Sequence, residues 1–270
     1  MLESDLMSIL AWSKKTVLVG DMNQLPAISH VDKEQELKVP LLESVTFTSS
    51  SVSYFERMFI HVKQNGWKFA YGELLAQGRM HKEIMDLVNP VFYDDTMVIR
   101  DESRQTVLLE SSLSARTKFE KILAHSRLLF VDVNAPGYRY SKVNTSEVKW
   151  VVQAVEALVS FEQPTDIGEF LVEKVGIIVP FRAQRTELRN AIETKYDGTE
   201  LESMLIDTVE SFQGSERDNI IISFSVNHED QLDQITSITH GKDKKLNVAL
   251  TRAQERLVMF GNAGILAKLP

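Results

Sequence analysis

Short apolar runs alternate along the chain with longer segments whose apolar residues recur at helical spacing. The runs are rich in β-branched residues, as buried strands of a parallel sheet are. The predicted strands are Thr16–Gly20, Leu128–Val133, Val175–Val179, Asn219–Val226 and Leu257–Gly261. The predicted helices are Leu2–Trp12, Val52–Lys63, Glu83–Phe92, Glu147–Phe161 and Ala183–Thr194. This order predicts an α/β fold of three layers around a mainly parallel sheet, with two polar loops at residues 32–51 and 100–114.

Composition excludes several classes of protein. The 270 residues are 43% apolar and 25% charged, which is typical of a globular protein. The chain has no cysteine, so disulfides, thiol nucleophiles and cysteine zinc sites are excluded. No apolar run approaches the roughly 20 residues that span a bilayer, and the N-terminus carries acids where an export signal carries lysines. We therefore expect an intracellular protein, cytoplasmic or nuclear, with no membrane partner.

The formal net charge of −8 argues mildly against a nucleic-acid partner, because domains that bind phosphates are usually basic. The charge is uneven, however. Residues 242–256 carry five basic side chains and only two acidic ones. A local basic surface on an acidic protein is therefore compatible with the composition.

Five short motifs lie beside predicted strands, and parallel sheets bind ligands at the ends of their strands. They are GDMNQLP (20–26), QGRMH (77–81), VPFRAQ (179–184), TVESFQGSERD (208–218) and LNVALTRA (246–253). Each has an ordinary structural explanation when taken alone. Gly-Asp after a strand is often a turn, a single arginine is usually a surface charge, and Phe181 and Phe212 are more often core residues than base-stacking platforms. His81 is more often a residue at a helix start than a metal ligand, and no metal-binding pair accompanies it.

Taken together and in this order, the five motifs resemble those of superfamily 1 helicases of the Upf-like branch. The resemblance runs from about residue 16 to 262, and the fourth and fifth motifs are long and specific. It implies RecA-like lobes that close on ATP and Mg²⁺ and bind single-stranded DNA or RNA. It divides the chain into residues 1–78, the end of a first RecA-like lobe, and residues 79–270, a complete second lobe.

The resemblance also implies a nucleotide site. Arg252 matches an arginine finger, Arg79 a second arginine at the γ-phosphate, and Gln24 a glutamine that senses this phosphate. These three are the implied catalytic residues. Gly214 and Glu216 complete the implied nucleotide-binding set, with Glu216 accepting hydrogen bonds from the ribose. Guanidinium groups suit this role because they stay ionised and present a fork of donors to phosphate oxygens.

A second implied site binds nucleic acid. Pro180 and Phe181 match a loop that contacts the single strand, and Thr208 and Ser211 match hydroxyl donors to its phosphates. Contacts to the backbone and to base faces tolerate any sequence, as a translocating motor requires. The resemblance implies no metal ligand in this chain.

Four residues depart from the family pattern. Gly78 stands where the family has a tyrosine that stacks on adenine, so base stacking comes from elsewhere or is lost. Val179 replaces a threonine of the strand-binding loop. Lys82 and Ala27 replace prolines.

The sequence also lacks two motifs of the family. No GxxxxGK[ST] occurs, since the only Gly-Lys pair, Gly241-Lys242, is followed by Asp243, and no DEAx run is present. We therefore expect the C-terminal part of a longer helicase, with the missing N-terminal lobe as a partner and no hydrolysis by this chain alone. A non-catalytic nucleic-acid-binding or regulatory module derived from a helicase is the alternative. An unrelated doubly wound enzyme would need a nucleophile or an acid–base pair at the strand ends, and no coherent set is present.

Overall fold

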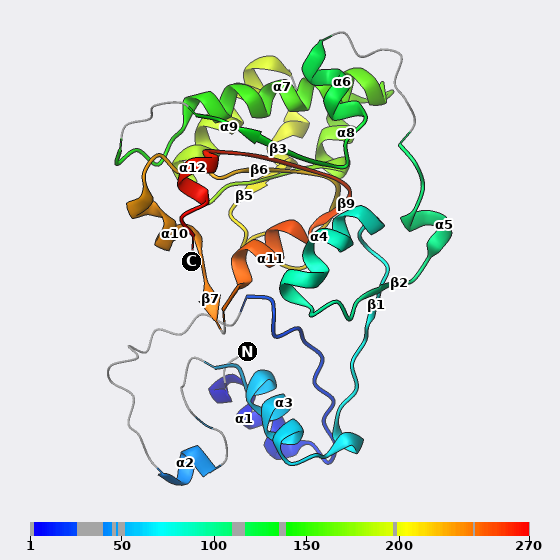
Figure 1. Ribbon diagram of the computed structural model, residues 1–270, viewed down its shortest axis with the longest axis vertical. Coiled ribbons are helices and arrows are strands. Elements are labelled where there is room, and N and C mark those ends of the chain that lie inside the picture. The colour runs from blue at the N-terminus through cyan, green and yellow to red at the C-terminus, as the bar shows by residue number, and fades with distance from the viewer. Residues whose placement is uncertain are drawn as a thin grey trace. The chain divides into compact units, whose positions relative to one another are not determined.

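The computed structural model describes residues 3–25, 40–44, 47, 52–109, 117–134, 139–196, 199–239 and 241–269 (Figure 1). The chain forms two compact units, residues 1–75 and 76–270. Among the described residues, no helix is long and apolar enough to cross a membrane, and no group of three or more histidine, aspartate and glutamate side chains could hold a metal ion.

The regular secondary structure in the described part of the first unit is helical. It contains α1 (Glu3–Trp12), α2 (Pro40–Ser44), α3 (Tyr54–Gln64) and the 3₁₀ turn Lys68–Ala70. Ser53 caps α3 by accepting a hydrogen bond from the backbone N–H of Glu56. Most of the predicted loop at 32–51 lies outside the described residues, and α2 forms in its described part.

The strand predicted at Thr16–Gly20 is wrong. This segment is not paired in a sheet, and Val17 and Val19 are 80% and 85% exposed. A strand needs a neighbour to pair its backbone N–H and C=O groups. The described residues of the first unit include no other strand, so the apolar pattern has no sheet to join.

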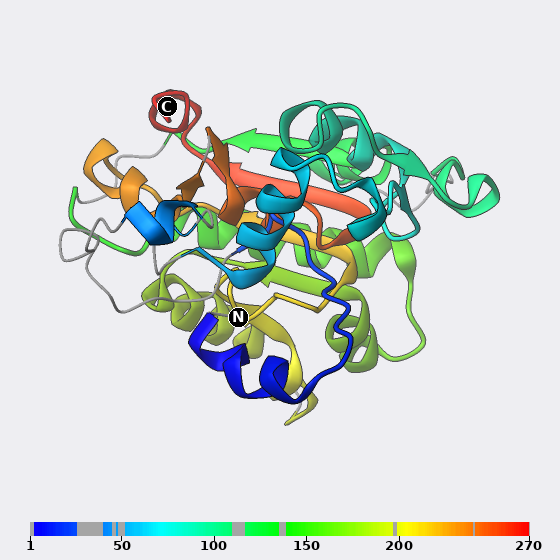
Figure 2. The same ribbon diagram turned by 90° about the horizontal axis from the view of Figure 1, so that it is seen from below.

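The second unit confirms the predicted α/β fold, with a fully parallel five-stranded sheet in the order β3-β9-β6-β4-β5. Figure 2 shows these strands side by side from below. Their bounds are β3 (Leu128–Asp132), β4 (Val175–Ile178), β5 (Leu205–Asp207), β6 (Arg217–Ser223) and β9 (Ala253–Gly261). Two small ladders flank the sheet, parallel β1 (Ala76–Gln77) with β2 (Val98–Ile99), and antiparallel β7 (Ile238–Thr239) with β8 (Lys242–Asp243).

Helices cover both faces of the sheet (Figure 1). One face carries α6 (Lys118–Ala124), α7 (Thr145–Glu162), α8 (Ile167–Lys174) and α9 (Arg182–Lys195), and the other carries α4 (Lys82–Phe92) and α11 (Lys244–Leu250). The remaining helices are α5 (Glu102–Gln105), which falls in the predicted loop at 100–114, α10 (Leu232–Ile235) and α12 (Ala263–Leu266), with 3₁₀ turns at Thr199–Ser203 and Glu229–Gln231.

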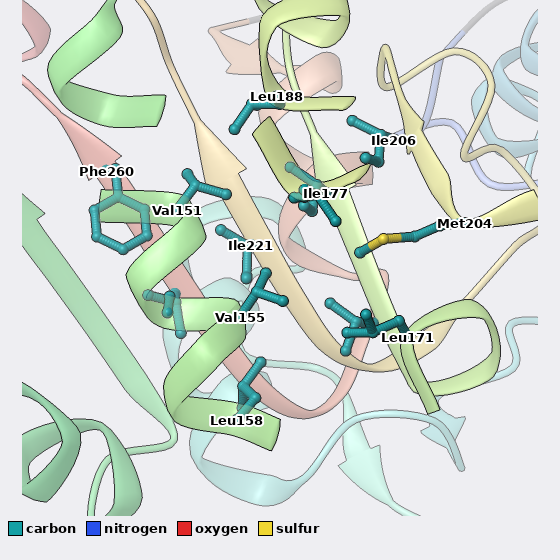
Figure 3. Packing of buried hydrophobic residues seen from close by; sticks show 14 of the residues in the cluster. Val151, Val155, Leu158, Leu171, Ile177, Leu188, Met204, Ile206, Ile221 and Phe260 are labelled. Atoms are coloured by element: carbon teal, nitrogen blue, oxygen red, sulfur yellow. The ribbon is translucent and has the colours of Figure 1, made fainter. Parts of the chain in front are cut away.

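The main core lies between the sheet and the α7 side. Val155 of α7 packs with Ile177 of β4 and Ile221 of β6, and all three are fully buried (Figure 3). All four residues of β4 are buried, which explains why this strand has a continuous apolar sequence. Phe212 is also fully buried, and its ring packs against Gly176. A Cβ added to Gly176 would lie only 2.8 Å from this ring. The core interpretation of Phe212 is confirmed.

Candidate nucleotide and single-strand sites

The two implied sites of the second unit lie at opposite ends of its parallel strands. We call the end at which the strands begin the amino edge and the end at which they finish the carboxyl edge. Gly214 and Glu216 directly precede β6, and Arg252 directly precedes β9, so these three lie at the amino edge. Pro180 follows β4, at the carboxyl edge.

Three distant segments meet at the amino edge. The backbone N–H of Arg217 donates to the carbonyl oxygen of Arg252 at 3.1 Å, which joins the fourth motif to the fifth. Arg79 of the second motif forms an ion pair with Glu216 and donates from Nη1 to the carbonyl oxygen of Thr251 at 3.3 Å. The Arg79 and Glu216 side chains are 32% and 43% exposed, so this ion pair remains accessible to solvent.

Arg252 is buried, with 1% of its surface exposed. Its guanidinium donates to the carbonyl oxygens of Val248 at 3.0 Å and Ser215 at 3.4 Å, and to the hydroxyl of Thr251 at 3.0 Å. It therefore lies beside the turn that contains Gly214 rather than in the apolar core. In this conformation the side chain holds two motifs together, and contact with a phosphate requires it to exchange some of these partners.

The chemistry of the amino edge fits part of a nucleotide site. Arg79 and Arg252 are permanent cations, and Glu216 is an acceptor that already takes a 2.9 Å hydrogen bond from Gln254. Gly214 has a positive φ of 89° with no atom within 4 Å of an added Cβ, so its loop surface is open. ATP and Mg²⁺ would still need a phosphate-binding loop and a magnesium-holding acid, which this sequence lacks.

In the second motif, Gly78 stands where the family has a tyrosine, and the structure describes its neighbours. An added Cβ on Gly78 would lie 3.4 Å from the Cδ of Arg100, and Arg104 donates to the Gly78 carbonyl oxygen at 2.5 Å. Arginine side chains therefore occupy the neighbourhood in which the family has a tyrosine.

His81 is the N-cap residue of α4, and its ring accepts a hydrogen bond from the backbone N–H of Glu83. Burial lowers the pKa of His81 below its usual value.

Gln24 lies in the first unit. Its side chain donates to Asp21 at 3.0 Å within a turn, and Asp21 also accepts from the backbone N–H of Asn23 at 2.9 Å. The turn is the local structure expected of Gly-Asp after an extended segment. Pro26, the last residue of this motif, lies outside the described part of the chain.

At the carboxyl edge, the third and fourth motifs come together because β4 and β5 are neighbours. The N–H of Val179 donates to the carbonyl oxygen of Asp207 at 3.0 Å, which places Pro180 beside Thr208. Ser211 is exposed, Thr208 is half-buried, and Phe181 is only 6% exposed. Phe181 therefore packs inward, and its ring is not a free stacking platform.

The helix that follows this loop presents unused donors. Phe181 is the N-cap residue of α9 and supplies no side-chain acceptor to the first turn, whose Arg182 and Ala183 are exposed. Backbone N–H groups at a helix start attract phosphate. Together with Thr208 and Ser211, they give the carboxyl edge several donors suited to a phosphate backbone.

A buried polar network lies under the carboxyl edge and was not predicted from the sequence. Gln184 donates to the Ser223 hydroxyl at 3.0 Å, and Ser223 donates to the Glu147 carboxylate at 2.7 Å. The Ser225 N–H also donates to Glu147 at 2.8 Å. Burial raises the pKa of Glu147 to about 7, against the opposing effect of the hydrogen bonds from Ser223 and Ser225. The Asn-x-x-Glu spacing from Asn144 is a helix-start signal, but it does not show that the glutamate is buried.

A mainly apolar cavity of about 310 Å³ lies at the carboxyl edge, on the α11 face of the sheet. Val209 and Leu246 line it, as do both members of an ion pair, Glu210 and Lys245, whose Oε1 and Nζ atoms are 3.2 Å apart. Glu210 also interacts with the Thr208 hydroxyl. The pair joins the fourth motif to Lys245, the residue directly before the fifth motif.

Comparison with known proteins identifies the family. Residues 51–264 match the family described as AAA domain. The chain belongs to this family, in the Upf-like branch of superfamily 1 helicases. It is 29% identical over 253 residues to Helicase sen1 of Schizosaccharomyces pombe, covering 93% of this chain and 13% of that protein. It is 28% identical over 270 residues to the DNA replication ATP-dependent helicase/nuclease JHS1 of Arabidopsis thaliana, covering 97% of this chain.

A third relative is the DNA polymerase alpha-associated DNA helicase A of Saccharomyces cerevisiae. It is 26% identical over 265 residues, which are 94% of this chain and 35% of that helicase. The chain spans 18% of JHS1. It is thus a helicase-like domain that corresponds to a minor part of each of these relatives.

Proposed function

We propose that this chain is the C-terminal motor region of an ATP-dependent DNA or RNA helicase. In this role the second unit supplies Arg252 and Arg79 to a nucleotide, while Pro180, Thr208 and Ser211 contribute part of a single-strand groove. The missing N-terminal lobe would supply the phosphate-binding loop and the magnesium-holding acid. Gln24 of the first unit would sense the γ-phosphate. We also propose that the protein is intracellular.

The observation that carries the proposal is the meeting of Arg79, Glu216 and Arg252 at the amino edge. They come from three separate segments, and hydrogen bonds and an ion pair join those segments. A module that only bound a strand would not need two arginines and a carboxylate at the edge opposite its strand-binding residues. Phosphoryl transfer does need such charges, because catalysis depends on neutralising and positioning the phosphate.

A chimera tests the nucleotide half of the proposal. The corresponding region of the S. pombe sen1 helicase would be replaced by residues 76–269 of this chain, and magnesium-dependent ATP hydrolysis would be measured. We expect hydrolysis that falls about 10³-fold or more with Arg252→Ala and is unchanged by the control Lys149→Ala. A folded, active chimera that is indifferent to Arg252→Ala would overturn the role of Arg252.

A second candidate function is a non-catalytic nucleic-acid-binding module. The closed Arg79–Glu216 pair and the burial of Arg252 favour it, because neither arginine is free in this conformation. It predicts a chimera that folds and binds a single strand but does not hydrolyse ATP. Strand binding by the 270-residue chain is common to both candidates. We expect a Kd of roughly 10⁻⁴–10⁻⁶ M that weakens as salt rises.

A further inference from the structure

The loop Ser141–Asn144, between β3 and α7, is fixed by side chains from other parts of the chain. The Asn227 amide donates to the carbonyl oxygens of Ser141 at 3.0 Å and Val143 at 3.1 Å. Gln231 donates to the same Ser141 oxygen at 2.8 Å. At the other end of the loop, the N–H of Asn144 donates to Gln184 at 2.9 Å. An exposed loop is thus held rigidly at the carboxyl edge.

Lys142 projects from this loop and is exposed. Its Nζ lies 5.4 Å from the centre of the Phe181 ring, and no described carboxylate forms an ion pair with it. Two other cations at this end of the unit are paired, Arg139 with Asp230 at 2.9 Å and Lys245 with Glu210 at 3.2 Å. Lys142 is therefore a positive charge carried by a loop whose backbone is held in place, without a compensating acid in the described chain.

The position of Lys142 at the carboxyl edge favours a phosphate of a single strand over a phosphate of a nucleotide as its ligand. Phe181 directly follows Pro180, whose strand β4 pairs with β5 just before Thr208. The nucleotide candidates precede their strands, at the other end of the sheet. A backbone phosphate of a single strand that followed Pro180 and Thr208, as proposed above, would pass this edge.

We propose that Lys142 is a further phosphate contact of the single-strand groove. The inference rests on the proposed strand binding at the carboxyl edge. The Lys142 ammonium neutralises one backbone phosphate, and the hydrogen bonds of the loop backbone with Asn227, Gln231 and Gln184 hold the Lys142 backbone in place in advance. Preorganisation of this kind lowers the entropy lost on binding. The contact to Phe181 orients the ammonium and covers a ring that the loop would otherwise leave at the surface.

The test is the salt dependence of binding to a fluorescent single-stranded oligonucleotide. For a single strand, each neutralised phosphate contributes about 0.7 to the slope of log K against log salt. We expect Lys142→Gln to reduce the magnitude of that slope by about 0.7 and Lys142→Arg to retain it. Lys149→Gln, an exposed lysine on α7, should leave it unchanged. Urea unfolding of each variant shows whether the fold is intact.

The outcomes distinguish the role of Lys142 from the proposed strand binding on which it rests. If the wild-type chain shows no salt-dependent binding, strand binding itself fails, and the role of Lys142 with it. If the wild type binds, Thr208→Ala weakens binding and Lys142→Gln leaves the slope unchanged, the inference alone is overturned. In that case, a loss of stability in Lys142→Gln would assign the side chain to covering Phe181.

Discussion

The two edges of the sheet in the second unit differ in how their polar groups are used. At the amino edge the candidate residues bind one another, since Arg79 pairs with Glu216 and Arg252 donates to backbone oxygens. At the carboxyl edge, Lys142 and Ser211 face solvent above a buried network. The proposed strand side therefore presents exposed polar groups, whereas the proposed nucleotide side must exchange internal partners before it can bind a ligand.

This difference has a physical consequence for ligand binding. A ligand shifts an equilibrium between two conformations only by the difference in its affinity for them. Opening the amino edge breaks the Arg79–Glu216 pair and hydrogen bonds of Arg252, so nucleotide affinity is reduced by that cost. At the carboxyl edge, Lys142 and Ser211 are already exposed and carry no such cost, whereas the half-buried Thr208 must exchange the interaction of its hydroxyl with Glu210.

The largest change in stability is expected at Phe212, which packs beneath the fourth motif, the motif that contributes residues to both edges. Phe212 lies between Ser211 and Gly214, is fully buried, and packs against Gly176. Phe212→Ala should lower the free energy of unfolding by about 3–5 kcal/mol, because it leaves a cavity under the fourth motif. Urea unfolding measures this, with the exposed neighbour variant Gln213→Ala as the control. Equal stabilities of the two variants would show that the ring does not support the motif.

The second effect concerns the network under the carboxyl edge and depends on pH. Burial raises the pKa of Glu147 from 4.5 to about 7, so the folded state holds a proton that the unfolded state has released. The free energy of unfolding should therefore fall as pH rises from about 4.5 to 7, by about 3 kcal/mol, and level off above 7.

Glu147→Gln should remove this dependence and be more stable than the wild type at pH 8. Glutamine can accept from Ser223 and Ser225 with its oxygen and place its amide where Oε1 has no partner among the described residues. The difference in unfolding free energy between the two proteins, measured from pH 4.5 to 8, isolates this group. Glu187→Gln, at an exposed position, should show no such trend. Parallel curves for the wild type and Glu147→Gln would contradict the burial argument.

The sequence predicts the parallel sheet well where apolar runs are flanked by helices. Val175–Val179 becomes β4 with all its residues buried, because a strand covered on both faces needs an unbroken apolar run. Thr16–Gly20 has the same pattern but forms no strand. An apolar run indicates that a segment can be buried, whereas strand pairing also requires a neighbouring strand from elsewhere in the chain.

The site residues show a similar division. Their order along the sequence suffices to place Pro180 near Thr208, because β4 and β5 are adjacent. It does not show that Arg252 is buried or that Phe181 packs inward. Nor does it reveal Glu147, whose burial depends on Ser223 and Ser225, about 80 residues away in sequence. Such properties arise from tertiary contacts.

The third effect compares the two arginines of the amino edge. Arg252→Ala should destabilise the fold by about 1–3 kcal/mol, because it leaves the buried carbonyl oxygen of Val248 and the partly buried one of Ser215 without this donor. Arg79→Ala should cost less than about 1 kcal/mol, because its pair with Glu216 is partly exposed. Thermal or urea unfolding of both variants checks the ranking. The reverse order would mean that Arg252 is already free for a ligand.

The smallest effect tests the ion pair between Glu210 of the fourth motif and Lys245, which directly precedes the fifth motif. Lys245 neutralises Glu210, which also interacts with the Thr208 hydroxyl of the proposed strand groove. Lys245→Ala should weaken single-strand binding about two- to fivefold, equivalent to roughly 0.4–1 kcal/mol, because it leaves a carboxylate near the phosphate path. Adding Glu210→Gln to this variant should restore the affinity, since the repulsion is then removed as well. Fluorescence anisotropy at low salt measures both variants. If the double variant binds as weakly as Lys245→Ala and the salt slope falls by about 0.7, Lys245 instead contacts a phosphate directly, and the carboxyl edge extends onto the α11 face.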